Sequence, residues 1–158
     1  MNKTLGAAML LFAGFTLSPI ASAIAAENVN IDTSANESQW WSTYSVEIQN
    51  TSNQTIDMTE STVEFLLPNA INDVSFVSSA LSYPSWTIEH EFTSEGVYHI
   101  ITYNFDDGAW VKDTLPRDGS FSFSFGLNSQ LPDFQSLENS LKFNGSGGAQ
   151  PPPPEPEL

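Results

Sequence analysis

The stretch Ser120-Phe121-Ser122-Phe123-Ser124-Phe125-Gly126-Leu127 alternates strictly between apolar and small residues. Successive side chains of a β-strand point to opposite faces, so this period of two places three phenylalanines and one leucine on one face. An aromatic strand face of this kind needs a second layer of structure to cover it. The sequence therefore predicts a packed β-structure built around residues 120–127.

Other short segments also have strand character, and turn-forming residues separate them. Strands are expected over residues 44–48, 56–67, 71–77, 86–92, 97–105 and 141–146. Residues 86–105 are typical of a β-hairpin that turns at Ser94-Glu95-Gly96. This pattern predicts an all-β single domain, an antiparallel β-sandwich of immunoglobulin-like type.

The segments that lack such alternation are expected to be irregular. Glu27–Gln39 is polar and is predicted to be a leader into the first strand. Residues 128–138 are predicted to be irregular, with Pro132 among them. No window after the N-terminal signal has apolar residues at helical spacing, so we expect no helix in the domain.

The two ends of the chain differ from the domain in composition. Residues 1–25 combine a lysine, a mostly apolar run and the small-residue cleavage signature Ala21-Ser22-Ala23, which is typical of a secretory signal peptide. Residues 147–158 are rich in glycine and then proline, which is typical of a linker that is flexible at first and then extended. We therefore expect a secreted (extracellular or periplasmic) domain over residues 28–146, followed by a linker.

The chain is strongly acidic and has no cysteine. Its formal net charge is −15, with 4 Lys and Arg against 19 Asp and Glu. Such a charge repels phosphate backbones and anionic membranes, so neither nucleic acid nor a membrane is an expected partner. Without cysteine the exported fold has no disulfide and depends on its core. We expect a monomer without a cofactor.

Histidines offer little for catalysis or metal binding. The only two are His90 and His99. With the hairpin turning at Glu95, residue 90 pairs with residue 100, and the two rings then point to opposite faces. The sequence thus predicts two separate surface or edge histidines rather than a shared metal site.

Carboxylate side chains offer two further candidate sites, one for calcium binding and one for acid/base catalysis. Asp106-Asp107-Gly108 has oxygen ligands for calcium, but the same residues form an ordinary solvated turn, which we favour. Glu89 and Glu91 share one strand face and suit an acid/base pair, but they equally suit the hydrated face of a hairpin. Without a cleft of long loops to hold a substrate, we expect no enzyme.

Tryptophan is the more informative residue type. The domain contains Trp40, Trp41, Trp86 and Trp110. Any one of them alone is best explained as a core or loop-packing residue. However, Trp110 lies among polar turn residues, and the adjacent pair Trp40 and Trp41 would point one inward and one outward on a strand. Exposed aromatic rings suggest a ligand, and the flat apolar faces of sugars stack well on indole.

Four stretches resemble the family 2 carbohydrate-binding modules, which bind cellulose, chitin or xylan and are appended to secreted polysaccharide hydrolases. They are Trp40 to Ser52 with its Asn-Thr-Ser ending, Thr62 to Pro68, Trp110 to Gly126 with its Leu-Pro-x-x-Gly-Ser spacing, and Leu141 to Ser146. The chain departs from that family by having Ser61 where a buried tryptophan is usual, and by lacking a cysteine pair. It is similar to a divergent member.

The resemblance implies a binding face of three exposed tryptophans. Matched by motif, these are Trp40 (or Trp41), Trp86 and Trp110. Trp86 is also in phase with the strand residues Ile88 and Phe92, as a core residue would be, and Tyr83 is then its substitute. We expect these five aromatic residues to include the carbohydrate-binding site.

Two functions remain open from the sequence. The first is a non-catalytic polysaccharide-binding module of a secreted chitinase or cellulase, joined to the catalytic glycosidase domain by the Pro-rich linker. Chitin, cellulose and xylan are not distinguished, because ring stacking alone does not recognise an N-acetyl group. The alternative is a secreted structural or adhesive β-sandwich that makes protein–protein contacts through its edge strands.

Overall fold

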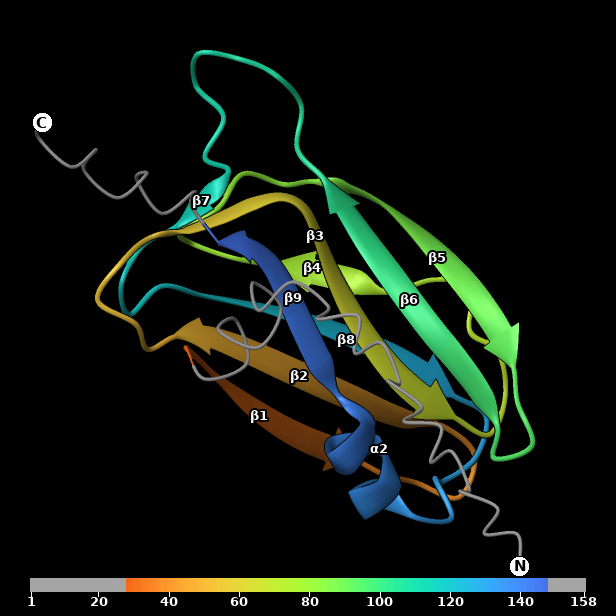
Figure 1. The fold of residues 1–158 in the computed structure, drawn as a ribbon. Helices are drawn as coiled ribbons and strands as arrows, with labels where there is room; N and C mark the ends of the chain where they lie inside the picture. Colours follow the sequence, from red (N-terminus) through yellow and green to blue (C-terminus); the bar gives the residue numbers. More distant parts are fainter. Residues whose placement is uncertain (1–27, 148–158) are drawn as a thin grey trace, which may run out of the picture.

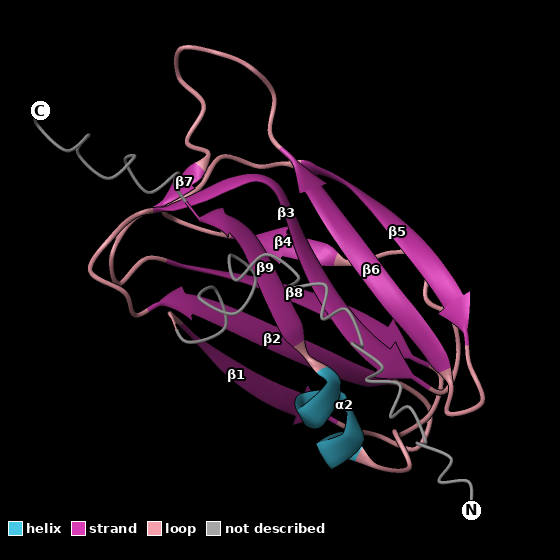
Figure 2. Cartoon of the chain, viewed as in Figure 1, coloured by secondary structure: helices cyan, strands magenta, loops and turns pink. Residues whose placement is uncertain are grey.

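The computed structural model describes residues 28–147, which fold into a sandwich of two antiparallel sheets (Figures 1 and 2). Sheet A has the strand order β1 (Val29–Asn36), β2 (Ser42–Asn50), β8 (Ser120–Leu127) and β4 (Ser75–Val77). Sheet B has the order β5 (Ser85–Phe92), β6 (Val97–Asn104), β3 (Ile56–Leu67) and β7 (Thr114–Leu115), and β9 (Lys142–Gly147) also pairs with β3. The predicted antiparallel β-sandwich is confirmed.

Strand β8 lies inside sheet A, between β2 and β4, and supplies the aromatic centre of the core. Phe121, Phe123 and Phe125 are buried, whereas Leu127 at the end of the strand is only half-buried. Phe65 of β3 stacks on Phe123 and Phe125 at centroid distances of 5.8 and 5.6 Å. The two sheets are therefore joined through the phenylalanine face that the alternation predicts.

The outer face of sheet A carries small polar side chains instead. The strand register places Ser34, Ser45, Ser124 and Ser75 next to one another across all four strands. The hydroxyls of Ser75 and Ser124 hydrogen-bond to each other at 2.6 Å. Gly126 continues the outward positions of β8 beyond Ser124, and this position matters for the site described below.

The predicted polar leader is wrong, because Val29–Asn36 forms the edge strand β1. Val29 and Ile31 are partly buried against the core, while Asn30 and Asp32, which alternate with them, are exposed. Only two large apolar residues mark this strand in the sequence, so its pairing with β2 decides its structure.

The prediction of no helix is also wrong, because Phe134–Ser140 forms the helix α2. The Asp133 carboxylate caps its N-terminus by accepting hydrogen bonds from the backbone N–H groups of Gln135 and Ser136. Leu137 is the buried residue of this helix. With seven residues, α2 is too short to show a helical period.

The sandwich has two ends. The loop end contains the end of β2, the start of β5 and the loop of residues 105–113 between β6 and β7, and there the Asn50 side-chain amide donates to the Leu115 carbonyl at 3.0 Å. The helix end contains the start of β2, the end of β3 and α2 (Figure 1). Since β2 has nine residues at about 3.3 Å each, the two ends lie roughly 25–30 Å apart.

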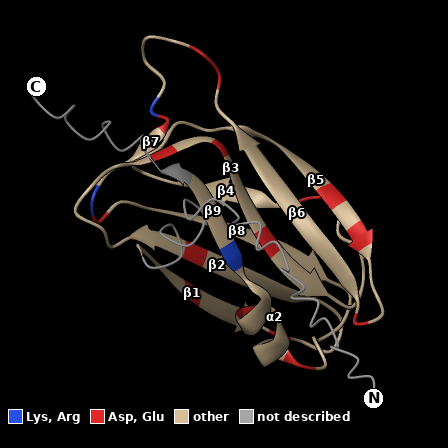
Figure 3. Ribbon diagram, viewed as in Figure 1, with Lys and Arg blue, Asp and Glu red and all other residues tan. Residues whose placement is uncertain are grey.

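The surface charge, the possibility of a membrane span and the two chain ends complete the description of the fold. Acidic positions are spread over both sheets and the connecting loops (Figure 3). No helix within residues 28–147 combines the length and apolar character needed to cross a membrane. The predicted signal peptide of residues 1–25 lies outside the described residues, as does the predicted linker apart from Gly147, which ends β9.

Candidate functional site: two aromatic ends of the sandwich

The tryptophans are divided between the two ends of the sandwich. Trp40 and Trp41 immediately precede β2, at the helix end, whereas Trp86 is the second residue of β5 and Trp110 lies in the 105–113 loop, both at the loop end. The expected single face of three tryptophans is therefore wrong. The physical reason is strand direction, because β2 and β5 start at opposite ends of the sandwich.

At the loop end, two aromatic rings project into solvent. Trp110 is 95% exposed and Tyr83 is 71% exposed. Trp86 is partly buried, and its ring contacts Tyr103 of the core edge-on at 6.4 Å and Tyr83 at 5.6 Å. Trp86 thus packs against the core, as its phase with Ile88 suggests. It also contacts the exposed Tyr83 ring and supports it.

A shallow hollow accompanies these rings. Tyr83, Pro84, Ser85, Trp86 and Asp106 line a space of about 360 Å³. Asp106 contributes a carboxylate beside two aromatic rings. A flat apolar surface next to a hydrogen-bond acceptor suits a sugar, whose ring faces are apolar and whose edges carry hydroxyls.

Hydrogen bonds hold the Trp110 loop beside the Tyr83 segment. The Ser82 backbone N–H donates to the Lys112 carbonyl at 2.9 Å, and the Lys112 N–H donates to the Ser82 hydroxyl at 2.8 Å. One residue further along, the Asp113 carbonyl accepts a hydrogen bond from the Met58 N–H of β3 at 2.8 Å. Trp110 is therefore exposed on a loop whose base is fixed to both a strand and the neighbouring aromatic segment.

At the helix end, a tight turn presents the other two tryptophans. The Trp41 N–H donates to the Ser38 hydroxyl at 3.0 Å, and that hydroxyl donates to the Trp41 carbonyl. Trp40 is 78% exposed and Trp41 is 54% exposed. The expectation that one points inward and one outward is wrong, because both residues precede the first paired residue of β2, Ser42.

The Trp41 ring lies directly on Gly126 of β8. A Cβ atom added at Gly126 would be 2.0 Å from the ring atom Cζ2, far inside van der Waals contact. Only glycine leaves room for the ring at this outward position. The indole therefore rests against the backbone of sheet A at the point where the row of outward serines ends.

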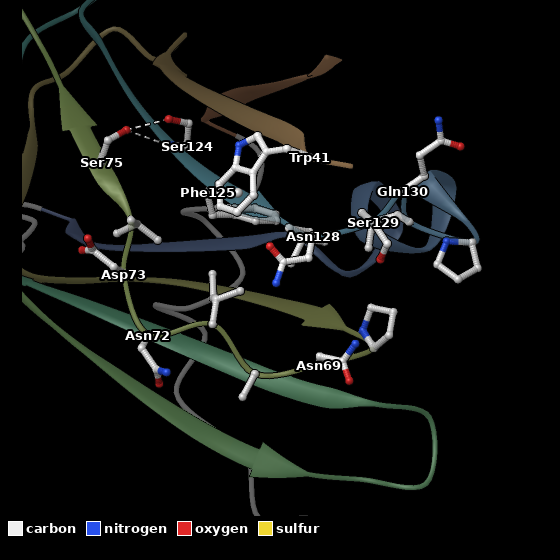
Figure 4. A pocket seen from close by; sticks show the side chains of 18 residues that line it. Trp41, Asn69, Asn72, Asp73, Ser75, Ser124, Phe125, Asn128, Ser129 and Gln130 are labelled. Carbon is white, nitrogen blue, oxygen red and sulfur yellow. Dashed lines mark hydrogen bonds between the residues drawn. The ribbon is translucent and has the colours of Figure 1, made fainter. Parts of the chain in front are cut away.

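Beside Trp41 lies a hollow, here named the Trp41 groove (Figure 4). Its volume is about 710 Å³, and the segments 68–75 and 124–132 line it together with Trp41. In Figure 4, Asn128 lies between Trp41 and Asn69, with Asp73 on the far side of the hollow. Its exposed polar side chains are those of Asn69, Asn72, Asp73, Ser75, Asn128, Ser129 and Gln130.

Two histidines hold the wall of this groove. The Ile71 N–H donates to His99 Nε2 at 3.0 Å, and His90 Nε2 donates to the Ile71 carbonyl at 2.6 Å. His99 Nδ1 donates in turn to the Val97 carbonyl at 3.0 Å. Burial, and then the neighbouring His90, lower the pKa of His99 from 6.5 to about 4. His99 is therefore neutral near pH 7, as an acceptor at Nε2 requires.

The prediction of opposed, separate histidines is wrong. His90 pairs directly with His99, and their rings meet edge to face at 4.9 Å. The cause is a hairpin loop of four residues, Thr93 to Gly96, which pairs Phe92 with Val97 and shifts the expected register by one. A shift of one residue moves a side chain to the other face of a strand.

The carboxylate candidates remain without catalytic surroundings. Glu89 and Glu91 are exposed on one face of β5, as predicted. Asp106 and Asp107 are the second and third residues of the 105–113 loop, and within residues 28–147 no group of three or more metal-ligating side chains is close enough to hold an ion. These residues form hydrated surface in the described domain.

The groove residues Asn69, Asp73 and Asn128 were not predicted. They lie in loops that the chain brings together only in the folded sandwich. One signal was available in the sequence: Gly126 interrupts the serines of the outward face, and a glycine inside a strand marks the close approach of another group.

Comparisons with known proteins concern the fold alone. The sequence matches no protein-family model and none of the curated proteins. Among solved structures, it is similar to a family 3b module of the major scaffoldin subunit of Acetivibrio cellulolyticus, with 10% identity, a TM-score of 0.46, and coverage of 80% of this chain and 99% of the other.

Two further solved structures are similar to this chain at a comparably low sequence identity. A family IIIa cellulose-binding domain of Clostridium cellulolyticum has 16% identity, a TM-score of 0.42 and coverage of 73% and 76%. A scaffoldin family 3b carbohydrate-binding module of Bacteroides cellulosolvens has 14% identity, a TM-score of 0.43 and coverage of 76% and 82%. These are modules of family 3, so the predicted resemblance to family 2 gains no support from them.

Proposed function

We propose that this chain is a non-catalytic polysaccharide-binding module. The observation that carries the proposal is the pair of projecting rings at the loop end, Trp110 at 95% and Tyr83 at 71% exposure, on segments tied together by hydrogen bonds. Large exposed aromatic side chains are unfavourable on a surface without a partner. A fixed pair of rings binds a flat ligand without a large cost in conformational entropy.

The ligand that we propose is an insoluble, neutral β-1,4-linked polymer, either chitin or cellulose. The rings project from the end of the sandwich, so they can reach the flat face of a polymer particle that could not enter a cleft. The acidic surface disfavours polyanions. The carboxylate of Asp106 beside Tyr83 and Trp86 provides an acceptor for sugar hydroxyls.

The remaining parts of the proposal depend on sequence features outside the described residues. The signal-like residues 1–25 support secretion, and the Gly/Pro-rich residues 147–158 support tethering to a catalytic glycosidase domain. In that setting the module would act as a monomer and raise the local concentration of the enzyme on its polymer. We expect the isolated chain to release no reducing sugar from chitin or cellulose.

A pull-down on insoluble chitin and on insoluble cellulose tests this function. We expect Trp110→Ala and Tyr83→Ala each to weaken binding about 5- to 150-fold, from about 1–3 kcal/mol per stacked ring as measured for bases. Phe92→Ala is the matched control, because Phe92 is also an exposed aromatic residue, 78% accessible, but lies at the far end of β5.

Two results would contradict the proposal. One is the absence of binding to either polymer by a protein whose fold is intact, which would favour the adhesive alternative. The other is equal loss of binding in Phe92→Ala and Trp110→Ala, which would indicate unspecific adsorption of aromatic surface. Binding to one polymer only would identify the ligand.

A further inference from the structure

The Trp41 groove is larger and more enclosed than the hollow at the loop end. Its volume of about 710 Å³, against about 360 Å³ at the loop end, is well within the range of small-molecule sites, about 300–1,000 Å³. One wall is the half-exposed Trp41 indole, and the opposite wall is the 68–75 segment. A hollow with an aromatic wall can receive a flat ring edgewise or against the indole face.

Three polar side chains of the groove are available to a ligand. Within residues 28–147, the side chains of Asn69, Asp73 and Asn128 make no hydrogen bond to another residue. Carboxamides both donate and accept hydrogen bonds, as sugar hydroxyls do. Asp73 is the sole charged residue in the lining, which contains neither lysine nor arginine. The groove therefore suits a neutral ligand rich in hydroxyls rather than an anion.

The walls of the groove are fixed before any ligand arrives. Gly126 lets the Trp41 ring rest on sheet A, and the Ser38 turn holds the backbone of Trp41. On the other side, His90 and His99 hold both backbone polar groups of Ile71. Preorganised walls reduce the conformational entropy that binding would otherwise lose.

We infer that the Trp41 groove binds a single, soluble oligosaccharide chain, as a second site separate from the aromatic loop end. The flat face of a crystalline polymer touches projecting rings but cannot enter a hollow, whereas a free chain can. The inference takes its ligand class, a neutral glycan, from the polysaccharide-binding function proposed above. The loop end would then bind the insoluble form of the polymer, and the Trp41 groove would bind its soluble single chains.

The test is a titration of the ¹⁵N-labelled protein with cellohexaose and with chitohexaose, followed by amide chemical shifts. We expect the largest shifts in residues 69–75 and 126–130, with little change around Tyr83 and Trp110. Gly126→Ala should displace the Trp41 ring and weaken oligosaccharide binding at least 10-fold, while binding to the insoluble polymer stays unchanged.

Matched variants make the test specific. Ser122→Ala changes another outward position of β8, away from Trp41, and should bind like the wild type. Asn128→Ala provides a second groove variant if Gly126→Ala fails to fold. Trp110→Ala should keep oligosaccharide binding while its polymer binding is weakened as predicted above.

The two proposals fail in different ways. Oligosaccharide shifts confined to the loop end, or no shift with either oligosaccharide while the insoluble polymer is bound, would overturn the groove site and leave the module function standing. Binding of oligosaccharide in the groove with no affinity for the insoluble polymers would overturn the proposed function on insoluble polymer and leave the groove site standing. Equal weakening by Gly126→Ala and Ser122→Ala would also overturn the groove assignment.

Discussion

Acid should destabilise this domain through His99. The imidazole of His99 is fully buried and stacks on Phe65 at 5.1 Å, and its Nε2 accepts a hydrogen bond from Ile71. Its pKa is lowered to about 4, below the usual 6.5 that it regains on unfolding. Between these values the unfolded chain binds a proton that the folded chain does not, so stability falls as pH decreases from 6.5 towards 4.

The magnitude follows from the two pKa values. The full difference corresponds to about 3 kcal/mol, at about 1.4 kcal/mol for each tenfold change in proton affinity. Roughly 2 kcal/mol of this should be lost between pH 7 and pH 4.5, since the unfolded His99 is then almost completely protonated and the folded one only partly. This is a substantial part of the usual 5–15 kcal/mol stability of a domain, roughly estimated.

Urea unfolding followed by tryptophan fluorescence at pH 7 and pH 4.5 measures the loss. Carboxylates add their own pH dependence, so the informative quantity is the difference between the wild type and His99→Gln. The variant should be less stable at pH 7 but should lose about 2 kcal/mol less on acidification. His90→Gln is the control that keeps the buried titrating group. An NMR titration placing the pKa of His99 above 6, or an equal acid loss in His99→Gln and wild type, would refute the reasoning.

Three further predictions concern stability. Phe123→Ala should lower the free energy of unfolding by about 3–5 kcal/mol in urea titrations, because the ring is buried against Phe65, while the folded fraction should still bind polymer. Asn50→Ala should cost about 1–3 kcal/mol in the same assay, because its buried amide donates to the Leu115 and Gln54 carbonyls, and Asn50→Asp should not restore the loss. Asp133→Ala should remove the N-cap of α2 and cost about 1 kcal/mol, visible as faster amide exchange within Phe134–Ser140 but not in β8.

The sequence was sufficient to predict that two layers of β-structure pack against each other. A period of two in residues 120–127 predicts an aromatic strand face, and the structure buries that face against β3. It was insufficient where a segment has little apolar character of its own. Strand β1 depends on its pairing with β2, and α2 has one buried residue, so neither gives a local signal.

The candidate site was predicted by residue type but not by arrangement. Exposure of Trp40, Trp41 and Trp110 agrees with a surface role, yet the sequence does not contain the strand directions that separate them between two ends. Similarly, one residue more or less in the hairpin loop decides whether His90 and His99 meet. Sheet topology and loop length are properties of the assembled fold rather than of a local pattern.

The histidine pair acts on the main chain of Ile71 rather than on any side chain of the groove wall. These two hydrogen bonds need only the backbone N–H and carbonyl of residue 71, so proline alone would remove one of them, while the Ile71 side chain itself is buried in the core. The neighbouring positions 69, 72 and 73 are exposed and take no part in this contact. The backbone of this wall is therefore held by different residues from those that face a ligand. We expect a library of substitutions at positions 69, 72 and 73 to change ligand preference without altering the backbone conformation of the wall.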